Sequence, residues 1–148
     1  MKAAKKSKSK AIGITQADID ASLEARKKET RRRLSLYDKA EKAERTLYDA
    51  MAVAKAAHKF WEQAQEAAVA AAGVSAMERA EAVSDAAKKF WEQSTNAVSH
   101  AQQALDAARD ELVDYNDRRA KQCEAQYHED LAFLNRWAEA YNAKAKKE

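Results

Sequence analysis

Between residues 36 and 115, apolar residues recur at alternating steps of four and three, which is the spacing of the buried seam in a heptad repeat. Proline is absent and only two glycines are present, so little in the chain would interrupt a helix. Each of two successive runs therefore predicts one long α-helix. The first run is Leu36, Ala40, Ala43, Leu47, Ala50, Ala54, Ala57, Trp61, Ala64, Ala68 and Ala71. The second is Met77, Ala80, Ser84, Ala87, Trp91, Ser94, Val98, Ala101, Leu105, Ala108, Leu112 and Tyr115.

Two sets of signals predict where these helices begin and end. Gly73 suits the left-handed position after a helix, and Ser75 with Glu78 has the spacing of a capping box that opens the next one. Thr15 with Asp18 can cap an earlier start, where Ile14 and Ile19 have the spacing of a hydrophobic staple. We therefore expect a basic N-terminal arm over residues 1–14 and a helical hairpin over 15–148. Helix one runs over about 16–72, the turn lies near 72–75, and helix two covers about 76–145.

The two heptad runs predict an all-α fold, and so short a turn makes the two helices antiparallel. The expected structure is a long antiparallel two-helix coiled-coil hairpin that is rod-like. Pairing each residue i with about 148 minus i brings a duplicated block together, A-A-H-K-F-W-E-Q at 56–63 and A-A-K-K-F-W-E-Q at 86–93. In that register Trp61 faces Ala87 and Trp91 faces Ala57. The same rule pairs Leu36 with Leu112, Leu47 with Ala101, Leu105 with Ala43, and Ile12 and Ile14 with Leu134 and Trp137.

Helix two is expected to continue past Leu112, because no breaker follows and one face keeps Tyr127, Leu131, Leu134, Ala138 and Tyr141. Two alternatives stay open at this point. The C-terminal stretch either extends or folds back, and helix one is either continuous or interrupted through E-T-R-R-R at 29–33.

The expected core is thin, because alanine supplies much of its apolar content, and a hairpin of this kind is marginally stable alone. We therefore expect protein partners or self-association. Phe60 and Phe90 lie one position off the seam, where they either shield the neighbouring tryptophans or form an exposed stripe on which another helix docks. The candidate partner-binding residues are Phe60, Trp61, Phe90, Trp91 and Trp137.

Positive charge is concentrated in two segments of a chain whose net charge is +3. Residues 1–10 contain five lysines and no acid, and residues 26–33 contain six bases and one acid, whereas residues 34–117 hold nine bases and fifteen acids. The hairpin would bring the basic segments to its open end. They either neutralise nucleic-acid phosphates or act as a solubilising tail and a charged face. The candidate anion-binding residues are Lys2, Lys5, Lys6, Lys8, Lys10, Arg31, Arg32 and Arg33.

Several functions are disfavoured. No apolar run is long enough to cross a membrane, and the start lacks the hydrophobic segment of a signal peptide, so we expect a location in the cytoplasm or within an assembly. The single cysteine, Cys123, allows no internal disulfide, and His128 with Glu124 alone makes no zinc site. No phosphate-binding loop, catalytic triad or H-E-x-x-H motif is found, so we expect no enzyme activity, no cofactor and no small-molecule substrate.

The leading hypothesis is a structural or assembly protein, a hairpin subunit, spacer or adaptor in a larger complex. In architecture alone such a hairpin is similar to the helical stalks of rotary and secretion ATPases and to helical subunits of phage particles. No motif carries residue roles over from them. The alternative is a sequence-independent nucleic-acid-binding protein that uses the basic arm and the basic open end.

Overall fold

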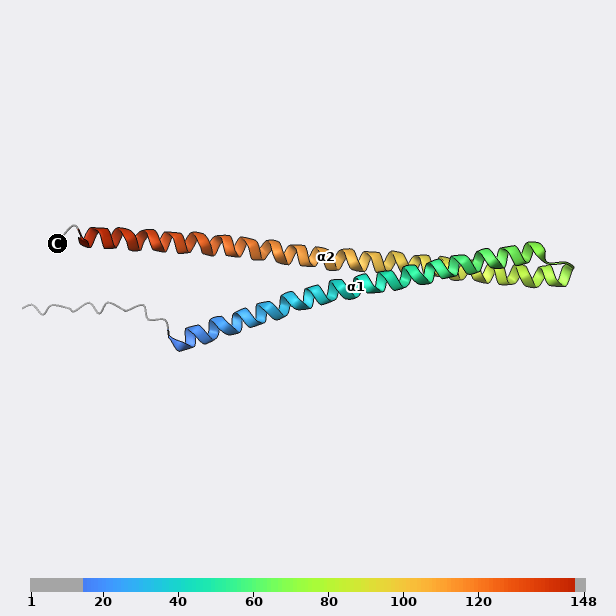
Figure 1. Cartoon of the computed structure of the whole chain (residues 1–148), viewed down its shortest axis with the longest axis horizontal. Coiled ribbons are helices and arrows are strands. Elements are labelled where there is room, and N and C mark those ends of the chain that lie inside the picture. Colours follow the sequence, from blue (N-terminus) through green and yellow to red (C-terminus); the bar gives the residue numbers. More distant parts are fainter. Residues whose placement is uncertain (1–14, 146–148) are drawn as a thin grey trace, which may run out of the picture. The chain divides into compact units, whose positions relative to one another are not determined.

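The computed structural model describes residues 15–145, with side-chain burial over residues 15–143. Within this range the chain forms two helices, α1 (Gln16–Ala70) and α2 (Val74–Ala145), and no strand (Figure 1). The prediction of an all-α helical hairpin is confirmed. The basic arm and the expected contacts of Ile12 and Ile14 lie outside the described residues.

The chain divides into two units, residues 1–34 and 35–148. The first contains the beginning of α1, and the second contains the rest of α1, the turn and α2. Both helices are continuous, so α1 runs without a break through residues 29–33 and α2 extends to Ala145 as one helix.

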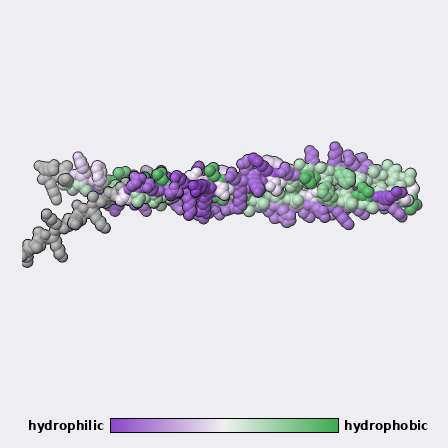
Figure 2. Space-filling model, turned by 90° about the horizontal axis from the view of Figure 1, so that it is seen from below, coloured by the Kyte–Doolittle hydropathy of each residue, from purple (hydrophilic) through white to green (hydrophobic). Residues whose placement is uncertain are grey.

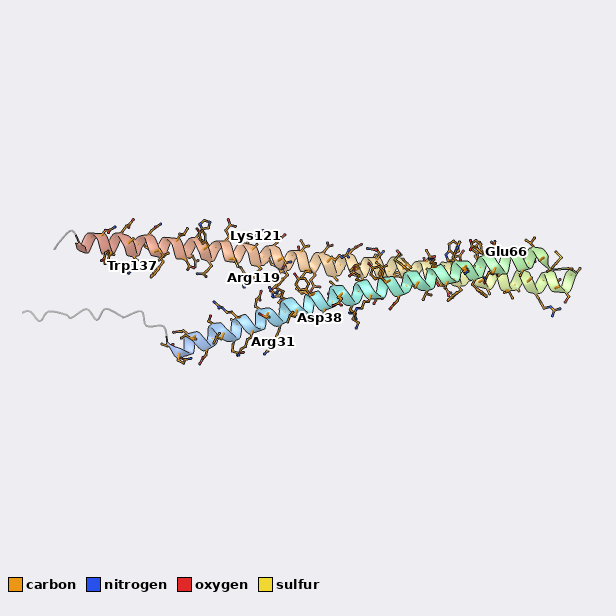
Figure 3. All side chains as sticks on the ribbon, in the orientation of Figure 1. Arg31, Asp38, Glu66, Arg119, Lys121 and Trp137 are labelled. Atoms are coloured by element: carbon orange, nitrogen blue, oxygen red, sulfur yellow. The ribbon has the colours of Figure 1, made fainter. Side chains whose placement is uncertain are left out.

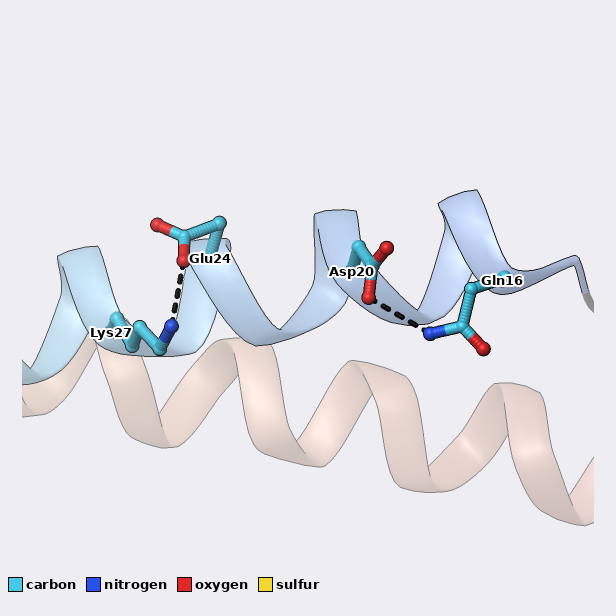
Figure 4. A network of polar contacts seen from close by, with 4 residues as sticks. All are labelled: Gln16, Asp20, Glu24 and Lys27. Atoms are coloured by element: carbon cyan, nitrogen blue, oxygen red, sulfur yellow. Dashed lines mark hydrogen bonds and ion pairs between the residues drawn. The ribbon is translucent and has the colours of Figure 1, made fainter.

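In the first unit, α1 begins at a capping box. The backbone N–H of Thr15 donates to the Asp18 carboxylate at 2.9 Å, and the N–H of Asp18 donates back to the Thr15 hydroxyl at 3.2 Å. These bonds satisfy amide groups that the first turn of a helix leaves without partners. Further along, Gln16 donates to Asp20, and Lys27 pairs with Glu24 at 2.8 Å (Figure 4).

The turn occupies only residues 71–73. Gly73 has φ of 90°, a conformation that side chains disfavour, as the left-handed prediction required. Its carbonyl accepts the N–H groups of Ala76 and Met77 at 3.1 and 3.0 Å, so Gly73 itself occupies the cap position of α2. The prediction that Ser75 caps α2 is therefore wrong. Ser75 lies inside the first turn, where its hydroxyl accepts a hydrogen bond from Arg79 at 3.0 Å.

In the second unit, α1 and α2 pack along the predicted seam. All eleven seam positions of the first run are buried or half-buried, as are those of the second run from Ala80 to Tyr115. Met77 is the exception, because α2 begins at Val74 and turns Ala76 inward in its place. Alanine accounts for five of the nine buried apolar residues, which confirms the thin core.

Cross-helix contacts define how the two helices are aligned. Leu47, Ala101 and Leu105 form a buried cluster against which Ala43 packs, as the pairing rule predicted. Two ion pairs flank the seam, Lys39 with Glu111, and Glu44 with Arg109 at 3.3 Å. These ion pairs lie on opposite edges of the seam, because Lys39 precedes a seam residue and Glu44 follows one.

Candidate functional site

The duplicated block forms an aromatic cluster at the seam. The indole rings of Trp61 and Trp91 stack with their centroids 4.9 Å apart and their planes inclined by 10°. His58 meets both rings edge-on, at centroid distances of 5.8 and 5.0 Å, and its Nδ1 lies 3.6 Å from a carboxylate oxygen of Glu62. Each half of the duplication thus contributes one indole to a single contact between the helices.

The prediction that each indole faces an alanine of the other helix is wrong. The assumed pairing placed residue 61 opposite residue 87, whereas the Lys39–Glu111 pair and the indole stack shift α2 along α1 by two to four residues, about half a turn to one turn. Ala57 and Ala87 are each only 1% exposed, so both helices approach closely one turn away from the indoles. The two alanines permit the close approach of the helices, and the two tryptophans stack on each other.

Phe60 and Phe90 lie together on one edge of the seam. Phe60 follows Lys39 by 21 residues, three heptads, and Phe90 precedes Glu111 by the same number. Because the seam keeps its seven-residue period over this distance, both rings lie on the edge marked by the Lys39–Glu111 pair. Phe60 is 50% exposed and Phe90 49% exposed. The stripe of exposed phenylalanines therefore lies beside the stacked indoles.

This edge is apolar well beyond the two rings. Residues spaced three or four apart share one side of a helix, and on this side α1 and α2 present the same five residue types in the same order. We call these ten exposed residues the phenylalanine face: Val53, Ala56, Phe60, Gln63 and Ala67 of α1, with Val83, Ala86, Phe90, Gln93 and Ala97 of α2.

Three observations bear on the phenylalanine face. Near the turn, Ala67 and Val83 line one shallow apolar depression together with Ala64, Ala76, Arg79 and Ala80, so residues of both helices meet on this edge. No member carries a charge. In the view of Figure 2, hydrophobic residues gather toward the turn end of the hairpin. An uncharged, half-exposed surface of this kind is typical of a protein interface.

The opposite edge of the seam is mostly polar. It bears the Glu44–Arg109 ion pair, and heptad steps from these two residues lead through Met51 to His58 on α1 and through Gln102 to Thr95 and Lys88 on α2. Each edge has an ion pair, but around the duplicated block the phenylalanine face carries no charge, whereas the opposite edge bears Lys88. The phenylalanine face therefore suits an apolar partner better.

The remaining candidate residues are not members of this face. Trp137 is 61% exposed near the end of α2 and stacks on Tyr141, with centroids 5.7 Å apart (Figure 3). Arg31, Arg32 and Arg33 are exposed on α1 in the first unit. Consecutive helical residues point in different directions, so these three arginines do not form one patch. Lys2, Lys5, Lys6, Lys8 and Lys10 lie outside the described residues.

Three further features of the described residues concern metal binding, the single cysteine and membrane spans. Over residues 15–143, no three His, Cys, Asp or Glu side chains gather closely enough to hold a metal ion. Cys123 is exposed. Neither α1 nor α2 has a segment long and apolar enough to cross a membrane.

Sequence reasoning found Phe60 and Phe90 but missed their surroundings. It did not single out Val53, Val83 or the contact of His58 with both indoles. The heptad position that Phe60 shares with Val53 and Ala67 was the available signal, because it repeats along α2 with Val83, Phe90 and Ala97.

Comparison with known proteins adds no relative. No protein-family model, curated protein or solved structure matches this chain. Any function must therefore be argued from the hairpin itself.

Proposed function

We propose that this protein is a structural or assembly component, a coiled-coil helical hairpin that joins a larger complex by docking helices on its phenylalanine face. Phe60, Trp61, Phe90 and Trp91 form the anchor, and Trp137 is a second contact toward the other end of α2. The observation that supports this most is the pairing of half-exposed phenylalanines on a face whose ten residues carry no charge.

The physical reason is the distribution of apolar residues on the two helices. A helix that packs against one partner needs apolar residues only at the two seam positions of each heptad, whereas a helix in a bundle needs a third. In the segment around the duplicated block, α1 and α2 both have this third position filled by Val, Phe or Ala. Such helices are suited to contact a further helix beside the one they already pack against.

Site-specific photocrosslinking in the cells that produce the protein tests this proposal. A photoreactive phenylalanine analogue in place of Phe60 is expected to give discrete covalent adducts with protein. The same analogue in place of Tyr48 is the matched control, because Tyr48 is an exposed aromatic of α1 outside the phenylalanine face. If both positions give the same diffuse background, the face is not an interface and the proposal fails.

A second candidate function is sequence-independent binding of nucleic acid. The exposed basic segment of α1, which contains Arg31, Arg32 and Arg33, supports it, together with the lysines of residues 1–10. Phosphate neutralisation predicts binding to duplex DNA that weakens steeply as salt rises and depends little on sequence. Deletion of residues 1–10, and separately replacement of the three arginines by glutamine, should each reduce this binding; unchanged affinity in both would exclude it.

A further inference from the structure

The two halves of the phenylalanine face are copies of each other. Residues of α1 and α2 that differ by thirty in number are identical at all five positions: Val, Ala, Phe, Gln and Ala. The helices run in opposite directions, and Phe60 and Phe90 lie at corresponding distances from the Lys39–Glu111 pair. An approximate two-fold axis therefore passes between the two phenylalanines, perpendicular to the face.

A face with its own two-fold axis looks the same after half a turn. A second, identical face can thus meet it with the phenylalanines at the centre and equivalent contacts on both sides. Closed dimers are built from such self-complementary patches, in which the same surface of each subunit is used. Large and small residues alternate along the face, so each ring can lie over an alanine of the other copy.

The ends of the face differ in charge. Asp49 precedes Phe60 by eleven residues and Arg79 precedes Phe90 by eleven, so they occupy equivalent positions at opposite ends of the face. Both side chains are exposed. If two copies pair in antiparallel orientation, the end that bears Asp49 meets the end that bears Arg79. Parallel pairing would bring like charges to the same end, so charge favours the antiparallel arrangement.

From these observations we infer that the partner on the phenylalanine face is a second copy of this chain, and that two hairpins pair through it in antiparallel orientation to form a four-helix bundle. This inference rests on the proposed function, because it names the partner of the same face. The interface needs no other protein, since each copy supplies the spacing of phenylalanine and alanine that the other requires.

Sedimentation equilibrium of the 148-residue chain, kept under reducing conditions, tests the pairing. The wild type is expected to form a dimer, and F60A/F90A is expected to raise its dissociation constant by roughly 100-fold or more, as loss of a central aromatic anchor does. The matched control is Y48A/Y127A, which removes two aromatic side chains that are at least as exposed and lie off the face. It should leave dimerisation unchanged. Circular dichroism would verify that each variant keeps its helix content.

Charge reversal tests the orientation without touching the apolar residues. D49R should weaken the dimer by placing two basic ends together, and D49R/R79D should restore it. A dimer that D49R leaves unchanged would overturn the antiparallel arrangement, because in parallel pairing D49R only replaces one contact between like charges by another. A monomeric wild type at all concentrations, or a dimer that persists in F60A/F90A, would overturn the inference as a whole.

The two proposals can fail separately. Crosslinked adducts from position 60 with the mass of two copies of the chain would support both the assembly function and the pairing of two copies. Crosslinks only to a different protein, together with a monomeric wild type, leave the assembly function standing and exclude the second copy as the partner. If position 60 gives no protein adducts, both the assembly function and the pairing of two copies are excluded.

Discussion

The indole of Trp61 stacks on the indole of Trp91 at 4.9 Å, with the two planes within 10° of parallel. The contact joins residues that occupy the same place in the two copies of the duplicated block. It explains why a chain with only three tryptophans has two of them in that block: each copy supplies half of one interaction between the helices.

The stack should be visible by circular dichroism. Two indoles at this distance couple their transitions, so the far-ultraviolet spectrum is expected to contain an exciton couplet superimposed on the helical signal. Trp61→Phe and Trp91→Phe should each abolish it, whereas Trp137→Phe, which removes the third indole, should not. A couplet that survives Trp91→Phe would mean that the indoles do not stack in solution.

Replacement of the same rings should also reveal their energetic coupling. Trp61→Ala is expected to lower the free energy of unfolding by about 2 kcal/mol, less than for a fully buried ring because Trp61 is only half-buried. In a double-mutant cycle with Trp91→Ala, the coupling energy should be about 0.5–1.5 kcal/mol. Denaturant titration of the four proteins measures it, and a coupling energy near zero would contradict the contact.

Leu105 should be among the residues most sensitive to truncation. It is 3% exposed and lies in the cluster with Leu47 and Ala101. Leu105→Ala removes buried apolar contacts in a thin core, and we expect a loss of about 3 kcal/mol in the free energy of unfolding. Val113→Ala, on an exposed position of the same helix, is the control and should change it by less than about 0.5 kcal/mol. Equal effects of the two substitutions would argue against this alignment of the helices.

The turn depends on the backbone conformation of Gly73. A Cβ atom added there would meet nothing within 4 Å, so the cost of Gly73→Ala comes from its φ of 90° alone. We expect a loss of about 1–2 kcal/mol in the free energy of unfolding. Gly73→Asn should cost less, because asparagine tolerates positive φ better than alanine does. Thermal unfolding of the two variants compares them directly, and an alanine variant as stable as wild type would show that the turn has another conformation.

The start of α1 should loosen in acid. Hydrogen bonds from the side chain and then the backbone of Thr15 lower the pKa of the Asp18 carboxyl below its ordinary value. The carboxylate therefore stabilises the helix start at pH values above the ordinary pKa of aspartate. This stabilisation is lost as the pH falls through the lowered pKa and the group becomes protonated.

Amide hydrogen exchange at residues 16–20, followed by NMR while the pH is lowered, measures this loosening. The protection of these amides should fall once the intrinsic pH dependence of exchange is taken into account. Asp18→Asn should remove that fall while leaving the turn at Gly73 unaffected. Protection that is independent of pH in the wild type would contradict the capping box.

Much of the hairpin could be predicted from the spacing of residues within each helix. The seam, the left-handed glycine and the cap at Thr15 all follow from local patterns, which depend only on the geometry of one helix or turn. The alignment between helices does not, because it depends on how many residues the turn uses. Gly73 both ends the turn and caps α2, so α2 begins earlier than expected.

The candidate site shows the same limit. Phe60 and Phe90 could be recognised as exposed apolar residues from their position beside the seam. That they lie on one edge was an expectation for an antiparallel hairpin, and the two cross-helix ion pairs agree with it. What the sequence did not show is that the two indoles stack on each other, because that depends on the axial alignment of the helices.

The three-residue turn also has a consequence for how the chain folds. Only residues 71–73 separate the two helices. When the helices first pack near Ala64 and Ala80, they therefore close a loop of fewer than twenty residues. Each seam contact that forms next enlarges this loop by only a few residues. Loop closure is therefore inexpensive in entropy at every step. The helices can pair progressively from the turn at Gly73 outward, so that Trp61 and Trp91 stack before Leu47 contacts Leu105. Because these contacts are close in sequence, we expect the hairpin to fold fast for its length.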